Sequence, residues 1–176
     1  MASVGRIRNQ RPLSGWPNVL LSGLPMKTVL FLCTGNYYRS RYAEILFNAK
    51  AEKMRLQWNA VSRGLAPDPR NPGPMFRDTM KALQKQGISV ESHLRLPMKV
   101  TEADFESNDH VVAVKEAEHR PMMLRNFPNW VTKVEFWHVH DLDCCGPDEA
   151  IPHLDQEVAA LLARLDNMMS EKSCEK

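Results

Sequence analysis

The sequence predicts a three-layer α/β fold in which helices cover both faces of a four-stranded parallel sheet. Short apolar segments of strand character alternate along the chain with segments of helical periodicity. Strands separated by helices pair in parallel through right-handed crossovers. The chain has 176 residues, of which 43% are hydrophobic, which suffices for one buried core. We therefore expect a single domain over residues 26–170.

Each expected strand is a short apolar run bounded by polar residues. The four runs are Lys27–Cys33, Gln57–Ser62, Asp109–Val114 and Lys133–Val139. In a parallel sheet the carboxyl ends of the strands meet at one edge, and ligands bind beyond that edge. Cys33 and the loop after the fourth run are therefore expected at the same edge.

The expected helices show apolar residues at helical spacing. Ser40–Arg55 and Pro74–Gln86 each carry one apolar face, and Gly87 provides a stop for the second. Thr101–Asp104 is typical of a capping start for a short helix. The clearest amphipathic stripe runs from Ile151 to Leu165.

The two ends of the chain differ from the expected domain. Residues 1–25 contain arginines but no acidic residue, which is also a feature of organelle-targeting segments. Pro17 and Pro25 interrupt any amphipathic helix there, so we expect a flexible extension or a start codon assigned upstream of Met26. Residues 171–176 are expected to form a C-terminal tail.

Composition and charge bear on the partners and the compartment. A net charge of +2 gives no indication of a nucleic-acid partner, and no apolar run of 18 residues indicates a membrane span. The four cysteines do not form a disulfide framework, which favours a reducing compartment such as the cytoplasm. No metal-ligand spacing stands out, and we expect a monomer or weak dimer.

The turn after the first expected strand carries an informative group of side chains. It is Cys33-Thr-Gly-Asn-Tyr-Tyr-Arg39-Ser40, and it leads directly into the first expected helix. A turn this short can converge its backbone N–H groups, and the helix adds its positive dipole end. The resulting bowl fits a phosphate-like dianion, with Arg39 clamping two oxygens and Cys33 acting as a thiolate nucleophile. A buried structural cysteine beside a surface arginine is the alternative.

This turn resembles the phosphate loop of the low-molecular-weight protein tyrosine phosphatases, which share their scaffold with thioredoxin-linked arsenate reductases. The family pattern is Cys-x-Gly-Asn-x-Cys-Arg-Ser-Pro after an apolar strand, and Val29 to Ser40 match it except at one position. Tyr38 replaces the second cysteine, and Arg41 replaces the proline that follows. The first change removes the thiol that traps an oxidised nucleophile in many relatives. The resemblance implies a phosphatase-type phosphate loop after the first strand.

A carboxylic acid is needed to protonate the leaving oxygen of a phosphate ester. The loop after the fourth expected strand offers Asp141 and Asp143. The family carries its acid in an Asp-Pro pair after a strand that ends in an aromatic segment. Trp137 to Leu142 resembles that pattern, with Leu142 in place of proline. The resemblance favours Asp141 over Asp143, although either can be a solvated loop residue.

The resemblance also implies residues that shape the turn. Asn36 is expected to adopt a strained or left-handed conformation, and Ser62 and His93 match residues that brace it. Ser40 can donate a hydrogen bond to the Cys33 thiolate. The expected substrate-binding residues are Thr34, Gly35, Asn36, Tyr37, Tyr38 and Ser40.

Three functions are compatible with these residues. We favour a phosphomonoester hydrolase that uses no cofactor or metal and acts through a cysteinyl phosphate on a phosphorylated protein or a small phosphomonoester. Phosphotyrosine is implied by the family, but Asp143, Cys144 and Cys145 replace the usual cleft aromatics. The alternatives are an arsenate reductase with Cys144 and Cys145 as relay thiols, and an inactive module that binds phosphorylated ligands.

Overall fold

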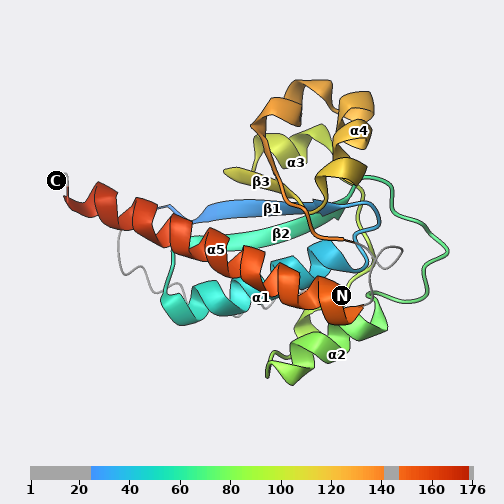
Figure 1. The fold of residues 1–176 in the computed structure, drawn as a ribbon, viewed down its shortest axis with the longest axis horizontal. Coiled ribbons are helices and arrows are strands. Elements are labelled where there is room, and N and C mark those ends of the chain that lie inside the picture. Colours follow the sequence, from blue (N-terminus) through green and yellow to red (C-terminus); the bar gives the residue numbers. More distant parts are fainter. Residues whose placement is uncertain (1–24, 141–146, 175–176) are drawn as a thin grey trace, which may run out of the picture.

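The structure is a computed structural model that describes residues 25–140 and 147–174 (Figure 1). The expected N-terminal extension therefore lies outside the described residues, except for Pro25. The expected single domain begins with a strand at Lys27 and ends with a long helix.

Four parallel strands form the sheet, which confirms the predicted fold class. Their order across the sheet is β2-β1-β3-β4, and their bounds are β1 Lys27–Cys33, β2 Trp58–Gly64, β3 His110–Ala113 and β4 Val134–Phe136. The bounds of β1 are those expected from the sequence, whereas β3 and β4 are shorter. In the pairing register Cys33 lies opposite Gly64, so the ends of β1 and β2 meet at one edge.

Helices cover both faces of the sheet (Figure 1). The helical elements are α1 Arg39–Met54, α2 Arg77–Lys85, η1 Glu91–His93, α3 Glu102–Glu106, α4 Glu116–Asn126, η2 Pro128–Lys133 and α5 Pro147–Cys174. The long helix α5 packs beside α1 on one face, and α3 and α4 cover the other. Among the described residues, no helix combines the length and the apolar character that crossing a bilayer requires.

The strand β1 contributes to a separate hydrophobic cluster on each face of the sheet. Val29 and Phe31 pack into the cluster with α1 and α5. Leu30 and Leu32 pack into the opposite cluster, which includes Phe105 of α3. Successive side chains of a strand point to opposite faces, so a strand buried on both faces becomes a continuous apolar run. This burial fixes the place of Cys33 at the end of β1.

The predicted helix signals are found where the sequence places them. Helix α2 ends before Gly87, which has a φ of 73° and closes the helix with its N–H bonded to the Gln84 carbonyl at 2.9 Å. Helix α3 begins with a capping box between Thr101 and Asp104.

Two features of the helices differ from the expectation. Helix α4 is not among the expected helices, because Pro121 lies inside it and its first turn is acidic rather than apolar. Helix α5 continues to Cys174, into the segment that we expected to be a tail.

Candidate active site

The turn between β1 and α1 directs its backbone N–H groups inward. The carbonyl oxygens of Cys33, Thr34 and Tyr37 accept hydrogen bonds of 2.8–2.9 Å from N–H groups of the segment 65–76. Because the N–H of a trans peptide points opposite to its C=O, the N–H groups of these peptides point into the turn. The Asn36 N–H lies 3.2 Å from Cys33 Sγ. Such a convergence of donors suits an anion.

Cys33 lies at the floor of this turn and is buried. Its Sγ is 2.9 Å from Ser40 Oγ, which belongs to the first turn of α1. When the thiol is ionised, the Ser40 hydroxyl and the Asn36 N–H can both donate to the sulfur. Hydrogen bonds to the charged form of a group favour that form. The position of Cys33 therefore suits a thiolate nucleophile.

Asn36 has a left-handed backbone conformation, with a φ of 50°. Its buried side chain has a partner at each of its four hydrogen-bonding positions. Nδ2 donates to Ser40 Oγ at 3.1 Å and to Ser62 Oγ at 2.8 Å. Oδ1 accepts from the Met98 N–H and from Arg95 Nη1, each at 2.9 Å. These bonds hold a conformation that a non-glycine residue rarely adopts.

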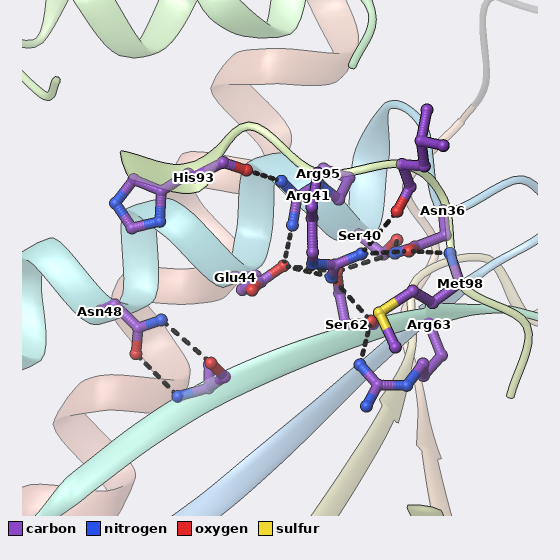
Figure 2. A network of polar contacts seen from close by, with 12 residues as sticks. Asn36, Ser40, Arg41, Glu44, Asn48, Ser62, Arg63, His93, Arg95 and Met98 are labelled. Carbon is purple, nitrogen blue, oxygen red and sulfur yellow. Dashed lines mark hydrogen bonds and ion pairs between the residues drawn. The ribbon is translucent and has the colours of Figure 1, made fainter. Parts of the chain in front are cut away.

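A charged network beside Asn36 supports it (Figure 2). Glu44 Oε2 accepts hydrogen bonds from Ser62 Oγ at 2.5 Å, Arg41 Nη1 at 2.7 Å and Arg95 Nη2 at 3.1 Å. Arg41 is buried where the family pattern has proline, and Glu44 compensates its charge. The departure from the family pattern at this position therefore belongs to the support of the turn.

The structure differs from the expectation at His93. The imidazole ring points away from Asn36 in Figure 2, and burial lowers its pKa. The backbone carbonyl of His93 accepts a hydrogen bond from Arg41 instead. Arg95, two residues further along the chain in the loop after η1, makes the contact with Asn36 that we expected from His93. Ser62 lies where the sequence predicts a brace.

Arg39 is paired with a carboxylate that our predicted site does not include. Its Nη2 lies 3.0 and 3.2 Å from the two carboxylate oxygens of Glu118, in the first turn of α4. The Thr34 hydroxyl also donates a hydrogen bond to Glu118. Glu118 follows the carboxyl end of a strand, as Asp141 does, and this position is the signal that could have identified it.

A cleft of ≈ 370 Å³ opens over the turn. Its lining combines residues of the turn with residues from the segment 65–76 and from α4: Cys33, Thr34, Gly35, Tyr37, Tyr38, Arg39, Ala66, Asp68, Asn71, Phe76 and Glu118. The cleft thus brings together the predicted nucleophile, the predicted phosphate clamp and most of the predicted binding residues.

Aromatic rings form part of the lining of this cleft. The Phe76 ring lies 6.0 Å from the Tyr37 ring and 5.4 Å from the Tyr38 ring, both edge to face. The Tyr37 hydroxyl donates to the Pro72 carbonyl at 2.6 Å, which fixes the ring. The sequence predicts Phe76 as a core residue on the apolar face of a helix. In the structure it packs against the core and also lines the cleft.

Asp141 belongs to residues 141–146, which lie outside the described residues together with Asp143 and the cysteines at 144 and 145. The chain that leads to Asp141 is described. The Val139 N–H donates to the Val114 carbonyl at 3.0 Å, directly beyond the carboxyl end of β3. Since β3 is the neighbour of β1, this contact places Val139 at the carboxyl edge of the sheet, where Cys33 also lies.

Known proteins share this sequence pattern. A family model described as low molecular weight phosphotyrosine protein phosphatase matches residues 28–170. The protein-arginine-phosphatase of Bacillus subtilis is 33% identical over 106 residues, which are 60% of this chain and 67% of that protein. The low molecular weight phosphotyrosine protein phosphatase of Schizosaccharomyces pombe is 30% identical over a match of 105 residues that covers 52% of this chain and 58% of that protein.

The fold is shared with solved structures as well. The low molecular weight protein tyrosine phosphatase from T. tengcongensis is similar with a TM-score of 0.65 and 25% identity, over 81% of this chain and 99% of that chain. The matched family model includes β1, the turn, α1 and most of α5. The chain therefore belongs to the low molecular weight phosphotyrosine protein phosphatase family.

Proposed function

We propose that this chain hydrolyses phosphomonoesters, with phosphotyrosine in proteins as the preferred substrate, through a cysteinyl-phosphate intermediate. The observation that carries this proposal is the meeting of a buried thiol, a guanidinium and inward-pointing N–H groups in one cleft. Membership of a phosphatase family supports the same reaction. A phosphoryl group in the cleft has Arg39 as its clamp and Cys33 as its nucleophile.

In the first step, Cys33 Sγ attacks phosphorus from the side opposite the leaving ester oxygen. The S–P bond forms as the P–O bond breaks, and the leaving oxygen takes a proton from the Asp141 carboxylic acid. Arg39 and the N–H groups of the turn bind the three equatorial oxygens, where negative charge is concentrated. The product of this step is the cysteinyl phosphate and the free alcohol or phenol.

In the second step, water attacks phosphorus and Asp141, now a carboxylate, takes its proton. The S–P bond breaks, inorganic phosphate forms, and Cys33 leaves as a thiolate. The Ser40 hydroxyl, 2.9 Å from Sγ, favours this departure by donating to the developing negative charge. The position of Val139 at the carboxyl edge of the sheet, two residues before Asp141, supports the role assigned to Asp141.

The aromatic lining of the cleft supports a phenolic leaving group. Tyr37 and Phe76 offer ring edges and faces to a substrate ring, and aromatic pairs favour such edge-to-face or offset contacts. These rings provide the aromatic surface that the sequence lacks at positions 143–145. Phosphotyrosine therefore fits the cleft better than an aliphatic phosphate ester.

Phosphoarginine is a second candidate substrate, because one relative is a protein-arginine-phosphatase. Its guanidinium leaving group would need a carboxylate partner. The described carboxylates that line the cleft, Asp68 and Glu118, are paired with Arg70 at 2.7 Å and Arg39 at 3.0 Å. Because Tyr37 and Phe76 give the cleft an aromatic surface that suits a phenolic leaving group, we rank phosphotyrosine first.

The two other functions rank below hydrolysis. An arsenate reductase needs relay thiols, and the candidates, Cys144 and Cys145, lie outside the described residues, whereas the matched family and relatives are phosphatases. A module that only binds phosphate needs no nucleophile. We also propose a cytoplasmic location, because a thiolate nucleophile requires a reducing compartment. We further propose that the protein is a monomer or weak dimer with no nucleic-acid or membrane partner.

Hydrolysis of p-nitrophenyl phosphate tests the proposed function. We expect Cys33→Ser to lower kcat by at least about a thousandfold, because the nucleophile is lost. Asp141→Ala should lower kcat by about 10²- to 10⁴-fold, the usual contribution of a general acid and base. The measurement is the initial rate of nitrophenol release by purified variants with unchanged circular dichroism spectra.

The double variant Cys144→Ser/Cys145→Ser is the matched control, since it removes two other thiols. The double variant should keep the wild-type phosphatase rate. If the wild type reduces arsenate and the double variant does not, that result would instead favour Cys144 and Cys145 as relay thiols. A wild-type protein that shows no thiolate-dependent turnover would contradict the proposed hydrolase activity and favour a module that only binds phosphorylated ligands. Rates on phosphotyrosine and phosphoarginine peptides then rank the two substrates, and we expect phosphotyrosine to be faster.

A further inference from the structure

Glu118 places a carboxylate of the protein itself in the candidate phosphate site. Its carboxylate lines the same cleft as Cys33 and lies 3.0 and 3.2 Å from Arg39 Nη2. The hydroxyl of Thr34, the residue after Cys33, donates to the same carboxylate. A phosphate oxygen would make the same type of charge-assisted contact with this guanidinium. In the absence of substrate, Glu118 therefore binds the group that a phosphate needs.

The surroundings of Glu118 hold its carboxylate in the ionised form. Glu118 lies in the first turn of α4, where the helix dipole favours negative charge. His119 Nδ1 accepts a hydrogen bond from the Lys115 N–H at 3.1 Å, which puts the proton of the neutral ring on Nε2, 3.6 Å from Glu118 Oε1. Burial alone would raise the pKa of Glu118, but contacts with His119, Thr34 and Arg39 hold it well below its usual range.

A phosphate dianion and the Glu118 carboxylate compete for Arg39. A bidentate clamp on phosphate uses the guanidinium edge whose Nη2 already binds Glu118. Two anions in a partly buried cleft also repel each other more strongly than in water. The Arg39 side chain is 2% exposed and fixed, whereas the Glu118 side chain is 27% exposed. Glu118 is therefore the partner that can turn away towards solvent when phosphate binds.

We infer that Glu118 is a built-in competitor for the phosphate site, displaced from Arg39 by the phosphoryl group of the substrate. The inference rests on the proposed function, because it concerns the same cleft. Each phosphoryl group that binds must displace the Glu118 carboxylate from Arg39. The affinity of the site for phosphate is therefore lower than it would be without Glu118. The same exchange assists the release of inorganic phosphate after the second chemical step.

The test compares inorganic phosphate binding by the wild type and Glu118→Gln. Titration calorimetry measures the affinity, and protection of Cys33 from iodoacetamide by phosphate measures it independently of turnover. We expect Glu118→Gln to bind phosphate about tenfold more tightly, which corresponds to the weaker end of a hydrogen bond to a charged group. With p-nitrophenyl phosphate, KM should fall while kcat does not rise, because product release slows.

Glu116→Gln is the matched control, because it removes the same charge from the same turn of α4. Glu116 is paired with Arg120 at 2.7 Å and is not among the residues that line the cleft. We expect its phosphate affinity to stay within about twofold of wild type, because Glu116 belongs to a partly exposed ion pair that does not contact Arg39. A gain in Glu118→Gln alone assigns the effect to the Arg39 contact rather than to net charge.

Unchanged or weaker phosphate binding by Glu118→Gln overturns the inference, as does an equal gain in Glu116→Gln. If Glu118→Gln does not fold, Glu118→Asp is measured in the same way. Its shorter side chain keeps the charge but reaches Arg39 less well, so tighter phosphate binding is again expected and unchanged binding overturns the inference. Wild-type protein that binds phosphate but shows no turnover contradicts the proposed function and leaves the competition intact.

Discussion

Asn36 shows how single residues hold the geometry of the candidate site. Its backbone is left-handed, and four hydrogen bonds compensate for that conformation. One of these partners is Arg95, where the family resemblance indicated His93. A guanidinium remains protonated in proteins at neutral pH, unlike an imidazole. The support of the turn therefore keeps its charge across the pH range in which histidines titrate.

Arg95→Ala tests this role at the residue scale. The change leaves Asn36 Oδ1 with the Met98 N–H and removes one of the two arginines paired with Glu44. We expect kcat on p-nitrophenyl phosphate to fall by about 10- to 100-fold, because small displacements of a positioned nucleophile are costly. The alkylation rate of Cys33 by iodoacetate should also fall, and a purely structural defect would not change it at equal folded fraction.

Arg125→Ala is the matched control for Arg95→Ala, because Arg125 is exposed in the last turn of α4. Its kcat and its alkylation rate should equal those of the wild type. An Arg95→Ala protein that is folded and retains wild-type values of both would show that Asn36 needs no support from the guanidinium.

The sequence predicts some site residues well and others not at all. Cys33 and Arg39 are contiguous in a turn whose ends are fixed by a strand and a helix, so their meeting follows from local structure. His93 ends the short helix η1 and Arg95 lies in the loop that follows, where side-chain direction depends on tertiary contacts. Glu118 comes from a helix that the sequence does not indicate. Its position after a strand end points to the sheet edge but does not determine its contact with Arg39.

At the scale of elements, burial decides which strands can be recognised in the sequence. β1 is buried on both faces and matches its expected bounds, whereas β4 covers Val134–Phe136 of the expected Lys133–Val139. Polar contacts fix β4 instead. Glu135 accepts hydrogen bonds from His110 of β3 at 2.9 Å and from Arg164 of α5 at 2.6 Å.

The pH dependence of stability tests this attachment of β4. Burial alone would raise the pKa of Glu135, but hydrogen bonds from His110, Arg164 and Trp137 lower it from 4.5 to about 2. A folded-state pKa below the unfolded value stabilises the fold above the unfolded value, and this stabilisation is lost as the pH falls through about 2. Glu135→Gln should therefore lower the free energy of unfolding near neutral pH by about 1–3 kcal/mol.

Urea unfolding at several pH values measures this difference, which should disappear as the pH approaches about 2. Glu52→Gln, on the exposed side of α1, is the control and should follow the wild type throughout. A Glu135→Gln protein that is equally destabilised at neutral and at acidic pH would show that shape rather than charge fixes β4.

At the scale of the whole molecule, the strand order places the cleft. β1 lies between β2 and β3, so the turn after β1 meets the segment after β2 and the first turn of α4 after β3. The sequence predicts the common edge, because parallel strands end together. It does not predict the order, because alternating strands and helices with right-handed crossovers are compatible with several orders. The residues that neighbouring strands place around Cys33 therefore cannot be predicted from the sequence alone.

The proposed reaction passes through a covalent cysteinyl phosphate, and trapping this intermediate tests the mechanism. Asp141→Ala is mixed with p-nitrophenyl phosphate, quenched in acid and analysed by intact and peptide mass spectrometry. We predict one phosphoryl group per molecule, bound to Cys33 and absent from Cys33→Ala treated in the same way. Turnover by the wild type with no phosphoryl group on Cys33, or with the phosphoryl group on another residue, would contradict the cysteinyl-phosphate mechanism.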